Sequence, residues 1–155
     1  MKHSPLQLLR YVVADLSCTA TPNFDPQKPF ESIIAEQLSV NVTVTQQKSP
    51  DNFPGHSWSV EMSISQTLKE GQNFPYTFKV SFVGFFACRD GFPSPTDEEQ
   101  FVRVNGSSML YGAARELVRS LTSRGPWGEL FIPSISFYDK NLKTQTEPAG
   151  PPQPV

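Results

Sequence analysis

Three successive segments of this 155-residue chain alternate apolar and polar side chains, and this alternation constrains the fold more than any other feature. Every second residue is apolar in residues 38–45, 57–65 and 74–82. Such a period of two is typical of strands that bury one face and leave the other in water. Because short stretches rich in Pro, Asn, Asp and Gly join the three segments, we expect an antiparallel meander.

The chain before and after this meander has a different pattern. Residues 6–20 are rich in Leu, Val and Tyr and predict a first strand, which Pro22 ends. Three prolines between residues 21 and 30 favour an extended crossover over a helix. From Val80 to Phe86 both faces of the strand are apolar, so a helix is expected on one face and a second subunit is a natural cover for the other. Gly84 predicts a bulge or a close backbone approach there.

The second half of the chain predicts helix. An apolar stripe at spacings of 3 and 4 indicates one main helix, which Ser107 or Ser108 caps and Gly125 ends; the stripe comprises Leu110, Ala114, Leu117, Val118 and Leu121. Before it, residues 96–104 form either a short helix with a Thr96–Glu99 capping box or an irregular segment.

The last part of the chain carries no further regular pattern. Residues 130–138, which Pro133 interrupts, form a short edge strand or a docked segment. The polar, proline-rich residues 141–155 predict a disordered tail that follows a single domain over residues 1–140.

Charge and hydropathy exclude several classes of protein. The net charge is −2 and no run of five Lys or Arg occurs, so we expect no nucleic-acid partner. No stretch of about 18 apolar residues predicts a membrane-spanning helix. Arg10 and Asp15 interrupt the apolar start, unlike the core of a signal peptide, so we expect no membrane insertion and a cytoplasmic protein.

The chain also lacks the residue patterns of an enzyme. Its two histidines, His3 and His56, form no metal-ligand pair and follow no nucleophile motif. Cys18 and Cys88 have neither CxxC nor zinc spacing. The acidic run at residues 97–99 is expected to be a solvated helix start. We therefore expect no catalytic residue, no metal and no cofactor.

Three short motifs resemble a known family. Residues 111–116 read Tyr-Gly-Ala-Ala-Arg-Glu, residues 123–127 read Ser-Arg-Gly-Pro-Trp, and residues 133–137 read Pro-Ser-Ile-Ser-Phe. With the strand patterns at residues 10–20 and 80–86, they resemble the SecB family of protein-export chaperones. The resemblance covers roughly residues 8–138.

This resemblance implies both a fold and an activity. The fold is α+β, a four-stranded antiparallel sheet with an early crossover followed by a long helix, assembled as a homotetramer that is a dimer of dimers. The activity is that of an ATP-independent holdase, which binds unfolded polypeptides in hydrophobic grooves and passes them to the SecA translocase motor.

Aromatic and Met side chains suit a groove that accepts many clients, because they offer large and adaptable apolar contacts. An ordinary core is the competing interpretation, and it is as well supported for residues 82–86 and for Trp127. The candidate client-binding residues are Trp58, Met62, Tyr76, Phe78, Phe82, Phe85, Phe86 and Trp127.

The surface that would meet SecA departs from the family. Asp15 stands at one acidic translocase-contact position, but Thr19 and Lys79 stand where other acidic residues are expected. The alternative is therefore a SecB-like chaperone dedicated to a single partner, such as an antitoxin. Arg115 is expected to have a structural role, anchoring an adjacent subunit or the edge of the sheet.

Overall fold

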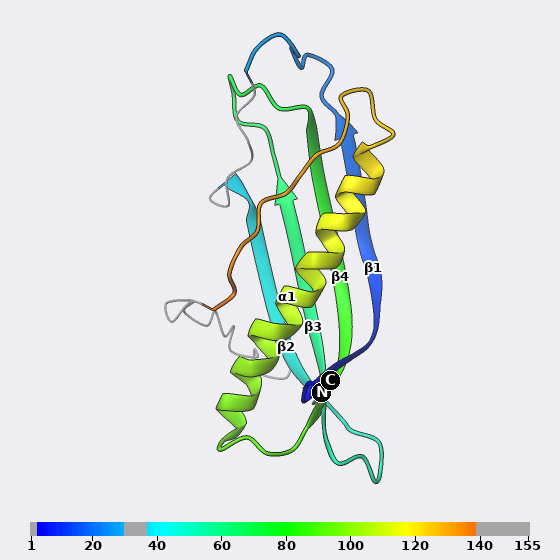
Figure 1. Cartoon of the computed structure of the whole chain (residues 1–155), viewed down its shortest axis with the longest axis vertical. Coiled ribbons are helices and arrows are strands. Elements are labelled where there is room, and N and C mark those ends of the chain that lie inside the picture. The colour runs from blue at the N-terminus through cyan, green and yellow to red at the C-terminus, as the bar shows by residue number, and fades with distance from the viewer. Residues whose placement is uncertain (1–2, 30–36, 139–155) are drawn as a thin grey trace, which may run out of the picture.

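The sheet has four strands, and one long helix covers one of its faces (Figure 1). A computed structural model describes residues 3–29 and 37–138. The predicted tail at residues 141–155 lies outside these residues. The elements follow the order β1 (Leu6–Ala20), β2 (Ser39–Gln47), β3 (Gly55–Gln66), β4 (Tyr76–Arg89) and α1 (Pro95–Thr122). Neighbouring strands are antiparallel in the order β1-β4-β3-β2, so the predicted meander and the crossover after the first strand are confirmed.

Strands β3 and β4 bury one face completely. Their even-numbered side chains point to α1, and Val60, Ile64 and Val80 have no exposed surface at all. The odd-numbered positions of β3 are mostly Ser and face the opposite side of the sheet. Strand β3 begins at Gly55, earlier than predicted, because its first residues pair with the end of β4. His56 therefore lies in a strand and not in a loop.

Strand β1 has the predicted bounds but a less regular backbone than its sequence suggests. Its pairing with β4 shifts register between Leu8 and Arg10 and again between Val13 and Asp15. Each shift inserts one unpaired residue, which is a β-bulge. The side chains of Tyr11 and Val13 face the helix side of the sheet, yet both are 45% exposed because α1 does not cover them.

Helix α1 is continuous, and the predicted break at Ser107 or Ser108 is wrong. The helix begins after Ser94, whose Oγ accepts a hydrogen bond from the Asp97 amide at 3.2 Å, so Thr96 is not the cap. Gly106 and Ser107 are buried because this part of the helix packs directly on the sheet. A methyl group on Gly106 would lie 3.1 Å from Cγ2 of Val60. These small residues therefore serve packing and not helix initiation.

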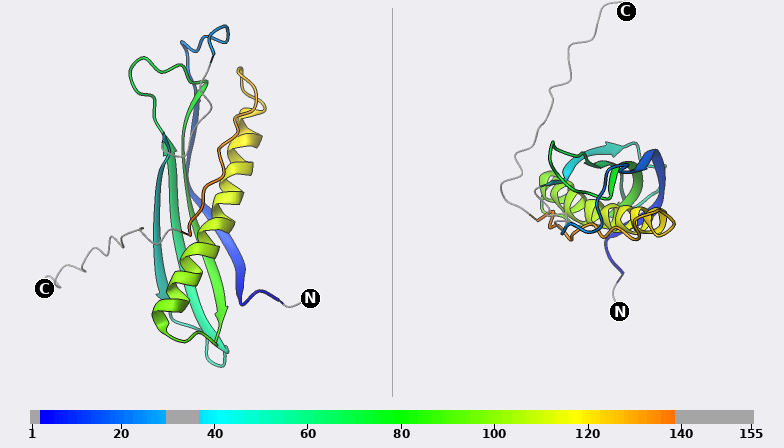
Figure 2. Two further views of the ribbon diagram at one scale, coloured as in Figure 1. Left: turned by 60° about the vertical axis from the view of Figure 1, so that its left-hand side comes forward. Right: turned by 90° about the horizontal axis from the view of Figure 1, so that it is seen from above.

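The axis of α1 crosses the sheet obliquely, as the two views of Figure 2 show. Its first turns lie over β2 and β3, and its last turns lie over β4 and β1. Gly84 of β4 sits beneath the middle of the helix, where a methyl group would lie 2.9 Å from Cδ2 of Leu110. The predicted close approach of another backbone at Gly84 is therefore wrong, since the side chains of Phe86 and Leu110 fill this space, and the pairing of Gly84 continues without a bulge.

The helix ends at Thr122 rather than at Gly125. Ser123 caps it, and its amide donates to the Arg119 carbonyl at 2.9 Å. Gly125 is required for another reason, because a methyl group there would overlap the hydroxyl of Tyr76. Among the described residues, no helix is long and apolar enough to cross a membrane.

Replacing Gly106 tests whether small size is what lets α1 approach the sheet. We expect Gly106→Val to lower the free energy of unfolding by about 1–3 kcal/mol, because the added atoms overlap Val60 and Phe86. Gly112→Val is the matched control in the same helix, since nothing lies within 4 Å of its added methyl group, and it should change stability by less than about 0.5 kcal/mol. Urea unfolding followed by circular dichroism measures both, and equal losses would contradict the packing role.

Candidate functional site

An extended segment runs back along α1 after the helix ends. Residues 129–138, which we call the strap, lie beside the helix over the inner face of the sheet (orange in Figures 1 and 2). The strap joins no strand ladder, so the docked segment is the correct one of the two predicted alternatives. Leu130, Ile132 and Phe137 are at most 7% exposed, while Phe131 and Tyr138 point outward. The strap therefore inserts three apolar side chains into the core.

Two side chains of α1 hold the main chain of the strap. The Tyr111 hydroxyl donates to the Pro133 carbonyl at 2.6 Å, and Nε of Arg115 donates to the Ile132 carbonyl at 2.9 Å. Residues four apart share one face of a helix, so the two donors lie side by side. Burial raises the pKa of the Tyr111 phenol, which keeps its proton available for this bond. Arg115 thus has the structural role expected of it, but within its own chain.

The start of the strap is fixed at the end of the helix. Oγ1 of Thr122 accepts from the Leu130 amide at 2.8 Å. The Tyr76 hydroxyl accepts from the Trp127 amide at 3.0 Å and lies 3.0 Å from the Gly128 carbonyl. This explains why Gly125 passes so close to Tyr76. The turn between α1 and the strap is therefore tied to the first residue of β4.

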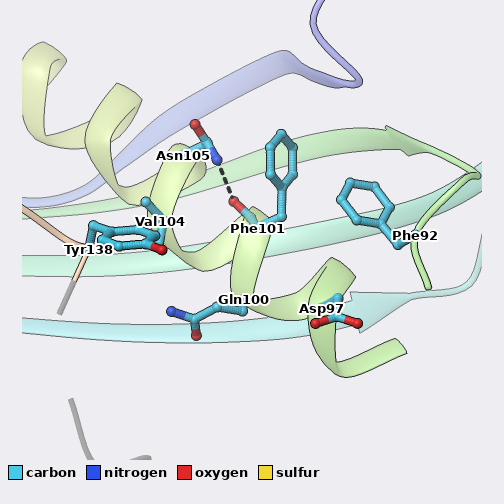
Figure 3. A pocket seen from close by; sticks show the side chains of 7 residues that line it. All are labelled: Phe92, Asp97, Gln100, Phe101, Val104, Asn105 and Tyr138. Atoms are coloured by element: carbon cyan, nitrogen blue, oxygen red, sulfur yellow. Dashed lines mark hydrogen bonds between the residues drawn. The ribbon is translucent and has the colours of Figure 1, made fainter. Parts of the chain in front are cut away.

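The strap ends beside an open pocket on the flank of α1. Its volume is about 240 Å³, and Figure 3 shows the side chains that line it: Phe92, Asp97, Gln100, Phe101, Val104, Asn105 and Tyr138. The rings of Phe92 and Phe101 are 5.0 Å apart at 45°. Asn105 turns its amide back to the Phe101 carbonyl at 2.9 Å. The pocket is therefore largely apolar inside.

Most of the predicted client-binding residues belong to the core of the protomer. Trp58 and Met62 of β3 face α1, as do four residues of β4, and each is at most 5% exposed; the four are Tyr76, Phe78, Phe82 and Phe86. The structure brings these six together beneath the helix and the strap. Their contact with a client stays a prediction, and none of them offers an open surface in this arrangement.

The other two candidates lie apart from this group. Phe85 is on the outer face of the sheet, where the Arg10 guanidinium lies 4.8 Å from the centre of its ring. Trp127 follows the helix, where its ring packs against Phe24 at 5.3 Å and its Nε1 donates to the Thr21 carbonyl at 3.2 Å. Trp127 therefore joins the helix end to the crossover connection.

Asp15, the predicted translocase contact, forms an ion pair on the outer face. Its Oδ2 lies 2.8 Å from Nζ of Lys79. The hydrogen bond and the charge of Lys79 hold the pKa of Asp15 below its usual value. The carboxylate is thus ionised, but the adjacent Lys79 ammonium offsets its negative charge at this surface.

Glu98 corrects the expectation of a solvated helix start. It is only 5% exposed, and its carboxylate accepts from Nε1 of Trp58 at 2.8 Å and lies 2.9 Å from Nδ1 of His56. Glu98 therefore ties the first turn of α1 to β3.

Burial and the nearby Glu98 carboxylate raise the pKa of the Cys88 thiol to about 11, so this thiol is unreactive at neutral pH. Within the described residues, no three side chains converge as metal ligands.

Sequence reasoning missed the pocket and the two donors to the strap. Phe101 and Val104 are three apart and would have shown an apolar flank of one continuous helix. The expected break at residues 107–108 divided that flank between two elements. Tyr111 and Arg115 were noted as a motif, but no local pattern indicates that their partners are carbonyls about 20 residues away.

Comparison with known proteins agrees with this architecture. The family model for SecB, described as a preprotein translocase subunit, matches residues 2–146. The chain belongs to the SecB family. The resemblance that the motifs at residues 111–137 carry is therefore confirmed over nearly the whole chain.

Solved structures show the same fold at low sequence identity. A SecB-like chaperone of Mycobacterium tuberculosis, in complex with a peptide from an antitoxin, is 21% identical with a TM-score of 0.50. The match covers 84% of this SecB-family chain and 90% of that one. A protein of unknown function from Streptococcus agalactiae is 9% identical with a TM-score of 0.59, over 83% and 97% of the two chains.

Removing the Arg115 side chain tests how firmly the strap is held. We expect Arg115→Ala to lower the free energy of unfolding by about 1–3 kcal/mol, because a charged donor to a main-chain carbonyl is lost. Arg124→Ala, at an exposed position just beyond the helix, is the control and should change stability by less than about 0.5 kcal/mol. Thermal and urea unfolding measure both variants. A free energy of unfolding equal to that of the wild type for Arg115→Ala would show that the contact with the strap does not stabilise the fold.

Proposed function

We propose that this SecB-family chain is an ATP-independent holdase that binds unfolded polypeptides in the cytoplasm and supports their export. The observation that carries the proposal is the large apolar surface left open on a folded protomer. Nine large apolar side chains among the described residues are 39–72% exposed: Leu9, Tyr11, Val12, Val13, Leu16, Met109, Leu121, Phe131 and Tyr138. Surface of this kind indicates contact with other polypeptide chains, either subunits or clients.

The pocket between Phe92, Phe101 and Tyr138 is the open site that best suits a client side chain. Its volume of about 240 Å³ is enough for one large aliphatic or aromatic group. Each side chain buried in this way stabilises a complex by about 1.5–3 kcal/mol. Several such sites on one oligomer act together through effective concentration, so individually weak contacts hold a long client. No chemical step and no nucleotide is part of this activity.

A holdase of this kind suppresses aggregation without ATP. We expect the purified protein, near stoichiometric amounts, to keep an unrelated, chemically unfolded protein from scattering light after dilution. Val104→Asp places a carboxylate in the apolar pocket and should weaken the suppression about tenfold. Ser108→Asp, one turn along the helix at an exposed position, is the matched control.

The outcomes of this assay separate clearly once folding is checked by circular dichroism. Full suppression by Ser108→Asp and weak suppression by Val104→Asp support the pocket as a client site. No suppression by a folded wild-type protein would reject general holdase activity.

The uncovered part of β1 is proposed as a subunit contact. Among the described strands β1 pairs with β4 alone and is an edge strand, and its exposed Tyr11, Val13 and Leu16 all face the helix side of the sheet. Exposed apolar edge strands are sites of pairing with another chain. Such pairing supports assembly into a homotetramer, with two dimers joined through apolar surface such as that of Met109 and Leu121.

A charge on β1 tests this assembly. We expect Val13→Lys to lower the oligomer mass measured by light scattering, because a buried ammonium in the contact is costly. Thr45→Lys adds the same charge at an exposed position of β2, the opposite edge of the sheet, and should leave the mass unchanged. Equal masses for all three proteins would place the subunit contact elsewhere.

A second candidate function is a chaperone dedicated to one partner, such as an antitoxin. The ion pair between Asp15 and Lys79 favours it, because the acidic residue proposed to meet SecA is already neutralised. The SecB-like chaperone of Mycobacterium tuberculosis, in complex with an antitoxin peptide, has the same fold. Repeating the aggregation assay with several unrelated clients distinguishes the two functions, since a dedicated chaperone protects only its own partner.

A further inference from the structure

The strap is bound to the rest of the protomer in the manner of a peptide in a groove. Its main chain is extended and pairs with no strand. Tyr111 and Arg115 hold two successive carbonyls, those of Pro133 and Ile132, and the Leu130 amide donates to Thr122. None of these three bonds involves a strap side chain. Between residues 130 and 133 the helix therefore recognises the strap through groups that every polypeptide carries.

Apart from Glu129, whose carboxylate lies 3.3 Å from Nε of Arg119 at the start of the strap, the strap side chains are recognised by shape and hydrophobicity. Leu130 and Ile132 are two apart and both buried, Phe137 packs edge-on against the ring of Tyr111 at 5.7 Å, and the intervening Phe131 faces solvent. Recognition of extended peptides works in this way, since main-chain hydrogen bonds supply affinity and pockets for alternate side chains supply selectivity. The channel between α1 and the sheet thus has the properties of a binding site for extended apolar peptide.

We propose that this channel is the main client-binding site and that an extended apolar client segment enters it by displacing the strap. The proposal rests on the holdase function proposed above and specifies its site. The occupant is a stretch of unfolded polypeptide with large apolar side chains at alternate positions. The strap is its internal substitute, which keeps the channel filled in the free protomer.

The open pocket continues this channel. Tyr138, at the end of the strap, lines the pocket with Phe101 and Val104 of α1 (Figure 3). A client held first by one side chain in the pocket therefore lies beside the Tyr138 end of the strap. From there it can replace Phe137 and then Ile132 without both ends of the strap being released at once. Trp127 and Tyr76 keep the other end of the strap attached to β4.

If the client displaces the strap, a suitable substitution in the strap should increase the affinity for the client. A change that loosens the strap without altering the channel raises the fraction of binding-competent protein, and so it tightens client binding. Phe137→Ala is that change, because Phe137 is 7% exposed. Phe131→Ala is the matched control, since the same substitution in the same strap removes a ring that is 64% exposed.

Client affinity is measured by fluorescence anisotropy with a labelled, permanently unfolded polypeptide. We expect Phe137→Ala to bind about tenfold more tightly than wild type, and Phe131→Ala to change affinity less than about twofold. Wild-type or weaker affinity for a folded Phe137→Ala would overturn the proposal. If Phe137→Ala does not fold, strap displacement is tested on folded protein by a dye on the strap and by a competing strap peptide.

The first of these experiments measures the mobility of a dye attached to the strap. A dye on Ser134→Cys, an exposed strap position, should gain mobility when client is added to a chain that also carries Cys18→Ser. A dye on Ser120→Cys, exposed on α1, is the control and should not. Client binding with no change at residue 134 would show that the strap stays in place.

The second experiment uses a free synthetic peptide with the sequence of residues 128–138. It should compete with the labelled client for the wild-type protein, and a peptide of the same composition in scrambled order should compete more weakly. Absence of competition would reject the channel as the client site. Failure of the wild-type protein to bind any client is a different result, since it rejects the holdase function itself.

Discussion

The close contact of helix α1 with the sheet is the constraint on which the rest of the structure depends. It exists because Gly106 on the helix and Gly84 on β4 have no side chains where Val60, Phe86 and Leu110 need the space. Glu98 fixes the first turn of the helix to Trp58, and Tyr76 fixes the chain just after its last turn. With both ends held and the middle in contact, the helix has one position and one oblique direction across the sheet.

This oblique direction divides the molecule into two flanks with different properties. On one flank the strap fills the space between helix and sheet, and the pocket at Phe101 opens where the strap ends. On the other flank the helix leaves Tyr11 and Val13 of β1 uncovered. A single helix therefore separates the surface proposed for clients from the surface proposed for subunits. Client binding and assembly need not compete for the same apolar side chains.

The sequence predicted the sheet well but not the continuous helix, the strap or the pocket, for physical reasons. Alternation along β2, β3 and β4 depends on burial of one face and is visible in each strand separately. The helix was divided wrongly at Ser107 or Ser108 because Ser usually marks the start of a helix, whereas here Gly106 and Ser107 permit close packing. The aromatic residues of β4 were expected to bind clients, since alternation shows that a face is apolar but not what covers it. The strap, formed by Pro133 and its neighbours, lacks both helical and strand periodicity.

The two bulges in β1 have a consequence for the protomer before it assembles. A strand that adds to an edge must match its register along the whole contact, and the irregularities near Leu9 and Ala14 interrupt that match twice. A foreign strand of regular geometry can pair with only part of β1, while a second copy brings the same irregularities. The apolar edge is thus selective rather than merely adhesive, which protects newly synthesised protomers from indiscriminate β-aggregation.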